Sequence, residues 1–178
     1  MGIGPGRLHF CYGEKGKPEI SDQPSQAPIR FNASHSHGIA VFAFARCREI
    51  GIDVEMVRDI PDMVQIAKRF FSAGEFDGLS SLPESKRKEA FFNCWTRKEA
   101  FIKAIGDGLT MPLDSFEVSL VPGEPAELLK IHVDREESPR WCIQDIGLDP
   151  PHISAFAIEG DGRRLDNWQL FDYKEKPS

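Results

Sequence analysis

The stretch that most constrains this chain is residues 91–108, FFNCWTRKEAFIKAIGDG, which has the pattern of one amphipathic helix. Trp95, Glu99 and Lys103 are spaced by four residues, so they lie along one helix face. The apolar surface comes from Phe91, Phe92, Cys94, Trp95, Phe101, Ile102 and Ile105. Gly106 or Gly108 can end the helix in the left-handed conformation. The sequence therefore predicts a core helix with a carboxylate and an ammonium at its edge, although an ordinary surface pair of Glu99 with Lys103 also fits.

Residues 50–56, IGIDVEM, alternate apolar and polar positions in the way of a β-strand. This period of two places Asp53 and Glu55 on the same face of the strand. Upstream, we expect a short strand in residues 7–12, an extended loop to residue 28, and β-rich runs at 29–32 and 38–45 around a polar corner at 32–37. A tight turn at 46–49 predicts that the run at 38–45 forms a hairpin with 50–56.

Downstream of the strand, residues 63–71 have helical spacing, and Ser72 to Glu75 has the form of a capping box that starts a short helix. A polar connection is expected at 83–88, before the long helix. Four strand-like runs follow, at 116–121, 128–133, 141–146 and 153–158, and they predict an antiparallel meander that closes a sheet. The expected class is a mixed α/β (α+β) fold with antiparallel sheets packed on a long helix.

Composition excludes several classes of protein. The 178 residues carry 22 basic and 28 acidic side chains, a net charge of −6, and this makes nucleic acid an unfavourable partner. No apolar run reaches the length of about 20 residues that a membrane span needs. The widely spaced cysteines, without a C-x-x-C pair, do not predict a structural zinc site or a disulfide scaffold. We therefore expect a cytoplasmic protein with reduced thiols and no membrane partner.

Three carboxylates stand out: Asp53 and Glu55 on one strand face and Glu99 on one helix face. An all-oxygen set of this size suits a hard cation such as Mg²⁺, completed by water and a substrate phosphate. Alternating acids on a strand are also typical of a solvent-facing side, so the pattern by itself leaves both interpretations open.

Three motifs in order decide between them. FNASHS at 31–36, GIDVE at 51–55 and WTRKEAFIK at 95–103 closely resemble the surfactin-type 4′-phosphopantetheinyl transferases, whose motifs are F-N-x-S-H-S, G-[IV]-D-x-E and W-[STA]-x-K-E-[AS]-x-x-K. The GKP triplet at 16–18 and PLDSF at 112–116 also resemble the family, so the likeness covers residues 7–160. Ala33 departs from the larger aliphatic residue often found inside the first motif.

The resemblance implies that the phosphopantetheine arm of coenzyme A passes to a serine of an apo acyl or peptidyl carrier protein, releasing adenosine 3′,5′-bisphosphate. It assigns Asp53, Glu55 and Glu99 as Mg²⁺ ligands and Lys103 as the lysine that acts on phosphate charge. Glu99 is the candidate base for the carrier serine, directly or through water, and the identity of the base stays open.

The resemblance also implies where coenzyme A binds. Ser34 and His35 correspond to positions that contact its phosphates, and Lys17 and Pro18 to the segment beside adenine and ribose. His37 lies outside the matched motif and is interpreted as structural or exposed. Lys98 belongs to the third motif, but it lies about 100° from Glu99 around the helix, which predicts a solvated or substrate-facing charge.

Family members are built as two similar halves, and the resemblance implies that residues 1–49 are the remnant of the first half and 50–178 the second. Residues 57–76 resemble the part that meets the carrier protein, although Met63, Ile66 and Phe70 can also be core residues. Because most of the first half has no counterpart here, two alternatives remain open. One is an impaired member that only binds carrier protein or coenzyme A, and the other is a magnesium-dependent pyrophosphatase that cleaves coenzyme A.

Overall fold

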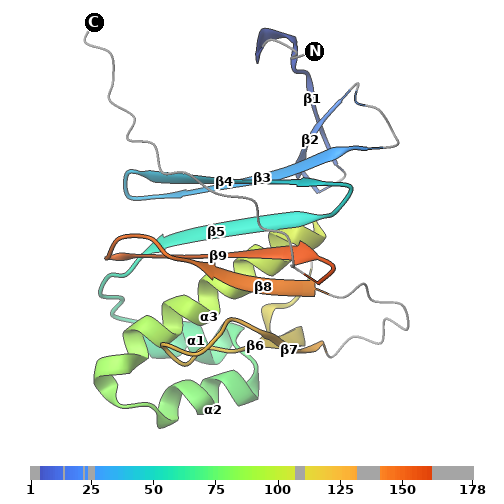
Figure 1. Ribbon diagram of the computed structural model, residues 1–178. Coiled ribbons are helices and arrows are strands. Elements are labelled where there is room, and N and C mark those ends of the chain that lie inside the picture. The colour runs from blue at the N-terminus through green and yellow to red at the C-terminus, as the bar shows by residue number, and fades with distance from the viewer. Residues whose placement is uncertain are drawn as a thin grey trace, which may run out of the picture.

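The computed structural model describes residues 5–13, 15–21, 23, 27–106, 111–131 and 141–161 (Figure 1). Its longer elements are β3 (Ile29–Ser36), β4 (Ile39–Arg46), β5 (Ile50–Met56), α1 (Met63–Phe70), α2 (Ala73–Ser81), α3 (Glu84–Ile105), β8 (Trp141–Ile146) and β9 (His152–Glu159). Its short elements are β1 (Phe10–Tyr12), β2 (Pro18–Ile20), β6 (Phe116–Val118), β7 (Leu128–Ile131) and 3₁₀ turns at Pro5–Arg7 and Leu113–Ser115. Every strand pair is antiparallel, which confirms the predicted mixed α/β class. No helix in these ranges is long and apolar enough to cross a membrane.

The central sheet has the strand order β5-β9-β8, and α3 lies across one of its faces (Figure 1). On that face α3 buries Ala100, Phe101 and Ala104 in a core with Ala155 and Ala157 of β9. On the opposite face a second, smaller core joins Ala45 of β4 with Ile50 and Ile52 of β5 and with Phe156 and Ile158 of β9. Strand β5 is therefore covered on both faces, and its odd-numbered residues point toward α3.

The strands β3 and β4 form a hairpin whose two-residue turn is His37 and Gly38. Both turn residues have positive φ, 43° and 85°, as a type I′ turn requires. The predicted polar corner at 32–37 is wrong, because β3 continues to Ser36. The predicted hairpin of 38–45 with 50–56 is also wrong: β4 pairs with β3, and β5 pairs with β9.

Three further expectations needed correction. The loop expected before residue 28 contains β2, which pairs with β1. The polar connection expected at 83–88 is the first part of α3, because its Ser, Lys, Arg and Glu residues form an exposed helical turn rather than a loop. The expected meander is divided, since β6 and β7 form a separate pair while β8 and β9 join β5.

Two predicted helix signals are confirmed. Ser72 and Glu75 form a reciprocal capping box at the start of α2. Gly106 ends α3 with φ 76°, and its amide donates to the carbonyl of Ile102. The described residues contain no disulfide, and Cys94 is buried in α3. The helix whose face carries Glu99 and Lys103 thus ends at the position that its glycine predicts.

Candidate active site

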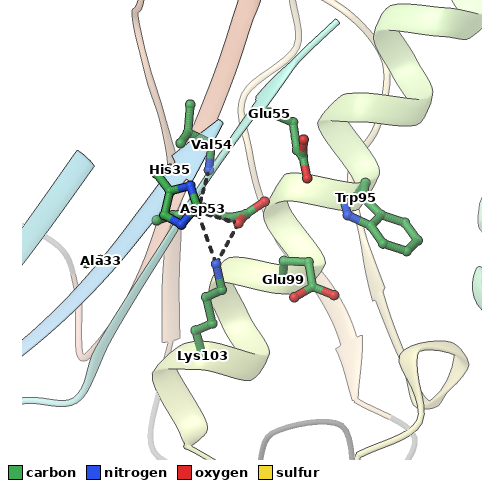
Figure 2. Close-up of a pocket in the computed structure, with 9 residues that line it drawn as sticks. Ala33, His35, Asp53, Val54, Glu55, Trp95, Glu99 and Lys103 are labelled. Atoms are coloured by element: carbon green, nitrogen blue, oxygen red, sulfur yellow. Dashed lines mark hydrogen bonds and ion pairs between the residues drawn. The ribbon is translucent and has the colours of Figure 1, made fainter. Parts of the chain in front are cut away.

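A cavity of about 430 Å³ lies where β3, β5 and α3 meet. It is lined by Ala33, Ser34, His35, Asp53, Val54, Glu55, Trp95, Glu99 and Lys103. Figure 2 shows the carboxyl groups of Asp53, Glu55 and Glu99 and the ammonium of Lys103 around the same space. The structure therefore brings together six residues that the sequence selected from three separate motifs.

Gly51 sets the distance between the strand and the helix that form this cavity. A Cβ on Gly51 would lie 2.1 Å from the carbonyl oxygen of Ala100 and 2.3 Å from the amide nitrogen of Ala104. These are backbone atoms of α3, so they cannot move aside as a flexible side chain would. Only glycine lets β5 contact the helix backbone here, and this contact places Asp53 within reach of Lys103.

Strand β3 joins β5 through side chains instead of a backbone ladder. Asn32 Oδ1 accepts from the Ile52 amide at 2.9 Å, and Ser36 Oγ accepts from the Met56 amide at 3.2 Å. Between them, Ser34 Oγ lies 3.4 Å from the amide nitrogen of Val54. Alternate polar residues of FNASHS therefore satisfy alternate backbone donors of β5. The motif has a structural role that its sequence did not reveal.

Asp53 is the most enclosed of the three carboxylates that line the cavity, with a relative exposure of 4%. Its Oδ1 accepts from Lys103 Nζ at 2.7 Å and from Ser34 Oγ at 2.9 Å, while Lys103 Nζ also donates to Ser34 Oγ at 3.2 Å. Its Oδ2 is buried and has no hydrogen-bond partner among the residues that the structure describes. Burial raises the pKa of Asp53 above its ordinary value, although Lys103 acts in the opposite direction.

Glu55 and Glu99 share this electrostatic environment. Burial raises the pKa of Glu55, and the charge of Asp53 raises it further, while a hydrogen bond from Ser36 opposes this. The pKa of Glu99 is also raised, first by burial and then by Asp53. The cavity thus gathers three desolvated carboxylates that repel one another, a typical feature of functional sites.

These residues suit a divalent cation in chemistry and charge. The ligands are all oxygens, which Mg²⁺ prefers, and the unpartnered Oδ2 of Asp53 could accept one. Within the described part of the chain, however, no three His, Cys, Asp or Glu side chains converge tightly enough to form a ready-made metal site. Asp53 is bonded instead to the ammonium of Lys103.

Other predicted residues have different surroundings. His35 lines the cavity with an exposed ring, whereas Lys17 and Pro18 are not among its lining residues. Lys17 Nζ lies 2.8 Å from Glu49 Oε2 and donates to the Ala104 carbonyl at 2.8 Å, so its ammonium holds the last turn of α3. His37, as expected, is exposed in a turn.

The interpretation of Lys98 as a solvated or substrate-facing charge is wrong, because it is fully buried. Its ammonium donates to the carbonyls of Leu113 and Phe116 at 2.6 Å each and lies 2.8 Å from Glu75 Oε2. The remaining oxygen of Glu75 accepts from the Val118 amide. A buried ion pair and its hydrogen bonds therefore connect α2, α3 and β6.

Sequence reasoning missed this network and a second buried cation, Arg97. Arg97 is bound to Asp145 of β8 through two hydrogen bonds, of 2.6 and 3.0 Å, and to the Ser119 carbonyl. The capping box that begins at Ser72 was the sequence signal that could have identified Glu75 as a buried carboxylate, since the third residue of a helix can face inward. No local pattern marked Arg97, whose partner is 48 positions away.

A second cavity of about 250 Å³ adjoins the first, because Glu55 and Trp95 line both. Its apolar wall is formed by Ile60, Pro61, Ile66, Phe91, Phe92 and Trp95, and Arg58 and Asp59 complete it. Most of these residues belong to α3 or to the segment 57–76. Met63, Ile66 and Phe70 of α1 are half-buried against the core, while Lys68 and Arg69 are exposed.

Comparisons with known proteins give a consistent family. A profile of the 4′-phosphopantetheinyl transferase superfamily matches residues 49–158. The 4′-phosphopantetheinyl transferase HetI of Nostoc sp. is 37% identical over 168 residues, which cover 94% of this chain and 68% of that protein. The 4′-phosphopantetheinyl transferase Sfp of Bacillus subtilis is 42% identical over 113 residues, 64% of this chain and 48% of that protein. The chain therefore spans between about half and two thirds of the length of these relatives.

A solved structure, the holo-[acyl-carrier-protein] synthase of Thermotoga maritima, is 23% identical, with a TM-score of 0.47 over 63% of this chain and 62% of that one. The profile alone covers more than half of the residues, including the strand and helix that carry all three acidic groups. This chain belongs to the 4′-phosphopantetheinyl transferase superfamily.

Proposed function

We propose that this protein transfers the 4′-phosphopantetheine arm of coenzyme A to a serine of an apo carrier protein. The observation that carries the proposal is the charge pattern of the larger cavity. Three carboxylates line it, and Lys103 is the sole lysine or arginine among its described lining residues. A diphosphate would be repelled by this surface unless a divalent cation joined the two sets of oxygens. A cavity of this kind suits transfer chemistry on a diphosphate.

In the proposed reaction the carrier serine oxygen attacks the β-phosphorus of coenzyme A. The bond from that phosphorus to the bridging oxygen breaks, and adenosine 3′,5′-bisphosphate leaves with the electron pair. Glu99 accepts the serine proton, directly or through water; a cation bound to Glu99 would lower its pKa, so transfer through a water molecule is the arrangement that asks least of this carboxylate. Lys103, at the opposite side of the cavity from Trp95, would stabilise charge on the phosphate oxygens.

We propose that Mg²⁺ is held by Asp53, Glu55 and Glu99. When bound, Mg²⁺ would neutralise the diphosphate charge and orient the diphosphate for in-line attack. Asp53 would bind the cation through its unpartnered Oδ2, and the charge of the cation would offset the negative charges of Glu55 and Glu99. Burial raises the pKa values of all three, and repulsion from neighbouring carboxylates raises those of Glu55 and Glu99 further, so a cation there removes an existing electrostatic penalty.

The finer assignments also remain proposals. Asp53 with Glu55 favours the surfactin type. Lys17 and Pro18 are proposed to flank adenine and ribose through their backbone, since the Lys17 ammonium is bound elsewhere. Ser34 and His35 are proposed to contact the phosphates. Residues 1–49 are proposed as part of a first half, and two exposed phenylalanines on β4, Phe42 and Phe44, support this because a further half packed there would bury them.

The carrier protein is proposed to dock on residues 57–76. The smaller apolar cavity beside Glu55 and Trp95 supports this position, since a helix that presents apolar side chains could occupy it next to the reacting serine. Arg58, Lys68 and Arg69 lie in the same segment and suit an acidic partner.

The test is the intact mass of an apo carrier protein after incubation with this chain, coenzyme A and Mg²⁺. We expect a gain of one phosphopantetheine that a chelator abolishes, and no gain with Asp53→Ala. Coenzyme A left intact with the carrier still bound would favour a noncatalytic binding protein. Coenzyme A cleaved without any carrier would favour the pyrophosphatase.

A further inference from the structure

We propose that in the substrate-free protein the ammonium of Lys103 is the counter-ion of Asp53 and thereby weakens the binding of Mg²⁺. As a result, Mg²⁺ and the diphosphate of coenzyme A bind cooperatively. This inference rests on the proposed function and concerns the regulation of the same site. In the structure Lys103 is the counter-ion of Asp53, with Nζ 2.7 Å from Oδ1. Figure 2 shows its side chain extending from α3 toward Asp53. A lysine that binds phosphate must give up part of this contact.

The contact is strong enough to matter because it is shielded from water. The Asp53 side chain is 6% exposed and the Lys103 side chain 29% exposed, so screening by salt is limited. Ser34 reinforces the pair, since its hydroxyl donates to the same Oδ1 and lies 3.2 Å from Nζ. A cation that binds Oδ2 of Asp53 would therefore be repelled by the ammonium of Lys103, which is bound to Oδ1 of the same carboxylate.

The backbones around the pair cannot relieve this repulsion. The contact of Gly51 with the backbone of α3 fixes the separation of β5 from the helix. Lys17 and Gly106 hold the last turn of the helix, directly after Lys103. The movable part is the lysine side chain, which is long and partly exposed. A diphosphate in the cavity would draw Nζ away from Asp53 and leave that carboxylate to the cation.

The consequence is a coupling between two ligands of opposite charge. Without diphosphate, Lys103 weakens Mg²⁺ binding; with diphosphate, Lys103 binds the anion and the weakening disappears. By linkage, Mg²⁺ must strengthen coenzyme A binding by the same factor. The lysine would thus keep the three carboxylates partly neutralised until both ligands arrive.

The experiment is a Mg²⁺ titration followed by calorimetry and by the shift of the thermal midpoint, with and without coenzyme A. In wild type we expect coenzyme A to tighten Mg²⁺ binding at least about tenfold. In Lys103→Met we expect Mg²⁺ to bind the free protein at least about tenfold tighter than in wild type, because a charge a few ångströms away is removed. In that variant coenzyme A should tighten Mg²⁺ binding by a clearly smaller factor than in wild type, because only the direct attraction between the cation and the diphosphate remains.

Three further variants control for folding and for net charge. Lys103→Gln is a second neutral replacement, and Lys103→Arg should retain the weak binding of wild type. Lys86→Met removes the same charge from the exposed first turns of α3, about 25 Å away by helix rise, and should change Mg²⁺ affinity less than about twofold. Mg²⁺ affinity that is unchanged or weaker in both neutral variants would overturn the inference.

The mass assay separates the two claims. Transfer to the carrier with no coupling between Mg²⁺ and coenzyme A would overturn the inference and leave the proposed function standing. Coupling without transfer would support the inference and overturn the function. Mg²⁺ binding in none of the proteins would overturn the inference, and the mass assay would then decide the function separately.

Discussion

The acidic side chains that line the larger cavity are charged at a cost to the stability of the folded protein. Asp53, Glu55 and Glu99 are each less easily ionised in the folded protein than in the unfolded chain, because burial removes water, and for Glu55 and Glu99 repulsion from the other carboxylates adds to this effect. Such a cluster is tolerated where it serves a ligand. Replacing one of its members by a neutral isostere should therefore stabilise the protein while it impairs the site.

Glu99→Gln tests this at neutral pH. A raised pKa means that the folded protein binds more protons than the unfolded chain, so the free energy of unfolding falls as pH rises from the unfolded value of 4.5 through the folded one. The variant lacks this penalty. We expect its thermal midpoint at pH 7 to exceed that of wild type by up to about 4 °C, the shift that about 1 kcal/mol produces in a chain of this size.

Below about pH 4, where both states are protonated, the advantage of Glu99→Gln should vanish. The midpoints of urea unfolding of both proteins, measured at pH 7 and below pH 4, check the sign of the stability difference between them. A variant less stable than wild type at pH 7 would contradict the electrostatic penalty, and it would show that the Glu99 carboxylate makes a stabilising contact.

At the scale of elements, α3 connects the parts of the molecule. One side of it contacts the backbone of β5 at Gly51, and another buries Lys98 and Arg97 among partners from α2, β6 and β8. The exposed edge of the helix then presents Trp95, Glu99 and Lys103 to the cavity. The chemistry on one face depends on the packing of the others.

Gly51→Ala should separate β5 from α3. Its methyl group would overlap the Ala100 carbonyl and the Ala104 amide, so the strand must shift away from the helix backbone. We expect a loss of about 3 kcal/mol in urea unfolding, at the upper end of overpacking effects. The control is Gly147→Ala, where a Cβ meets no atom within 4 Å. Equal stability of the two variants would refute the close contact.

Lys98→Met should leave Glu75 as an uncompensated buried charge. Glu75 is 3% exposed, and its remaining hydrogen bonds come from the backbone amides of Ser72 and Val118. Breaking a buried pair in this way costs about 3–5 kcal/mol, measurable by urea unfolding. Adding Glu75→Gln should recover part of the loss. A loss below about 1 kcal/mol would mean that Lys98 is not the counter-ion of Glu75.

At the scale of the whole molecule, net negative charge coexists with a basic segment. The chain carries a net charge of −6, yet Lys68 and Arg69 are exposed together on α1, the helix whose Ile66 lines the smaller cavity. A local basic patch on an acidic protein can steer an acidic partner to one orientation. This arrangement supports residues 57–76 as the proposed surface for the carrier protein.

Lys68→Glu should lower kcat/KM for the carrier protein about threefold to tenfold at low salt, because steering weakens, and leave KM for coenzyme A unchanged. The difference should shrink at high salt as the charges are screened. Lys130→Glu, an equal charge change on the exposed strand β7, serves as control. A matching loss in both variants would assign the effect to net charge rather than to docking at α1.

Local periodicity in the sequence determined much of the fold and several candidate site residues. The period of two in residues 50–56 placed Asp53 and Glu55 on one face, and the period of 3.6 in residues 91–108 aligned Trp95, Glu99 and Lys103. The capping box and the glycine at the end of α3 were readable for the same reason, because the geometry of a helix terminus depends on a few neighbouring residues.

Which strands pair with each other, and which groups the buried charged side chains contact, was decided only by the tertiary structure. Whether β4 pairs with β3 or with β5 depends on which apolar faces can be buried together, and so does the position of Lys98 inside rather than outside. The contact between Lys103 and Asp53 joins residues 50 positions apart and requires Gly51 to bring strand and helix together. Periodicity predicts which face of a helix or strand a residue lies on, but long-range packing determines what that face packs against.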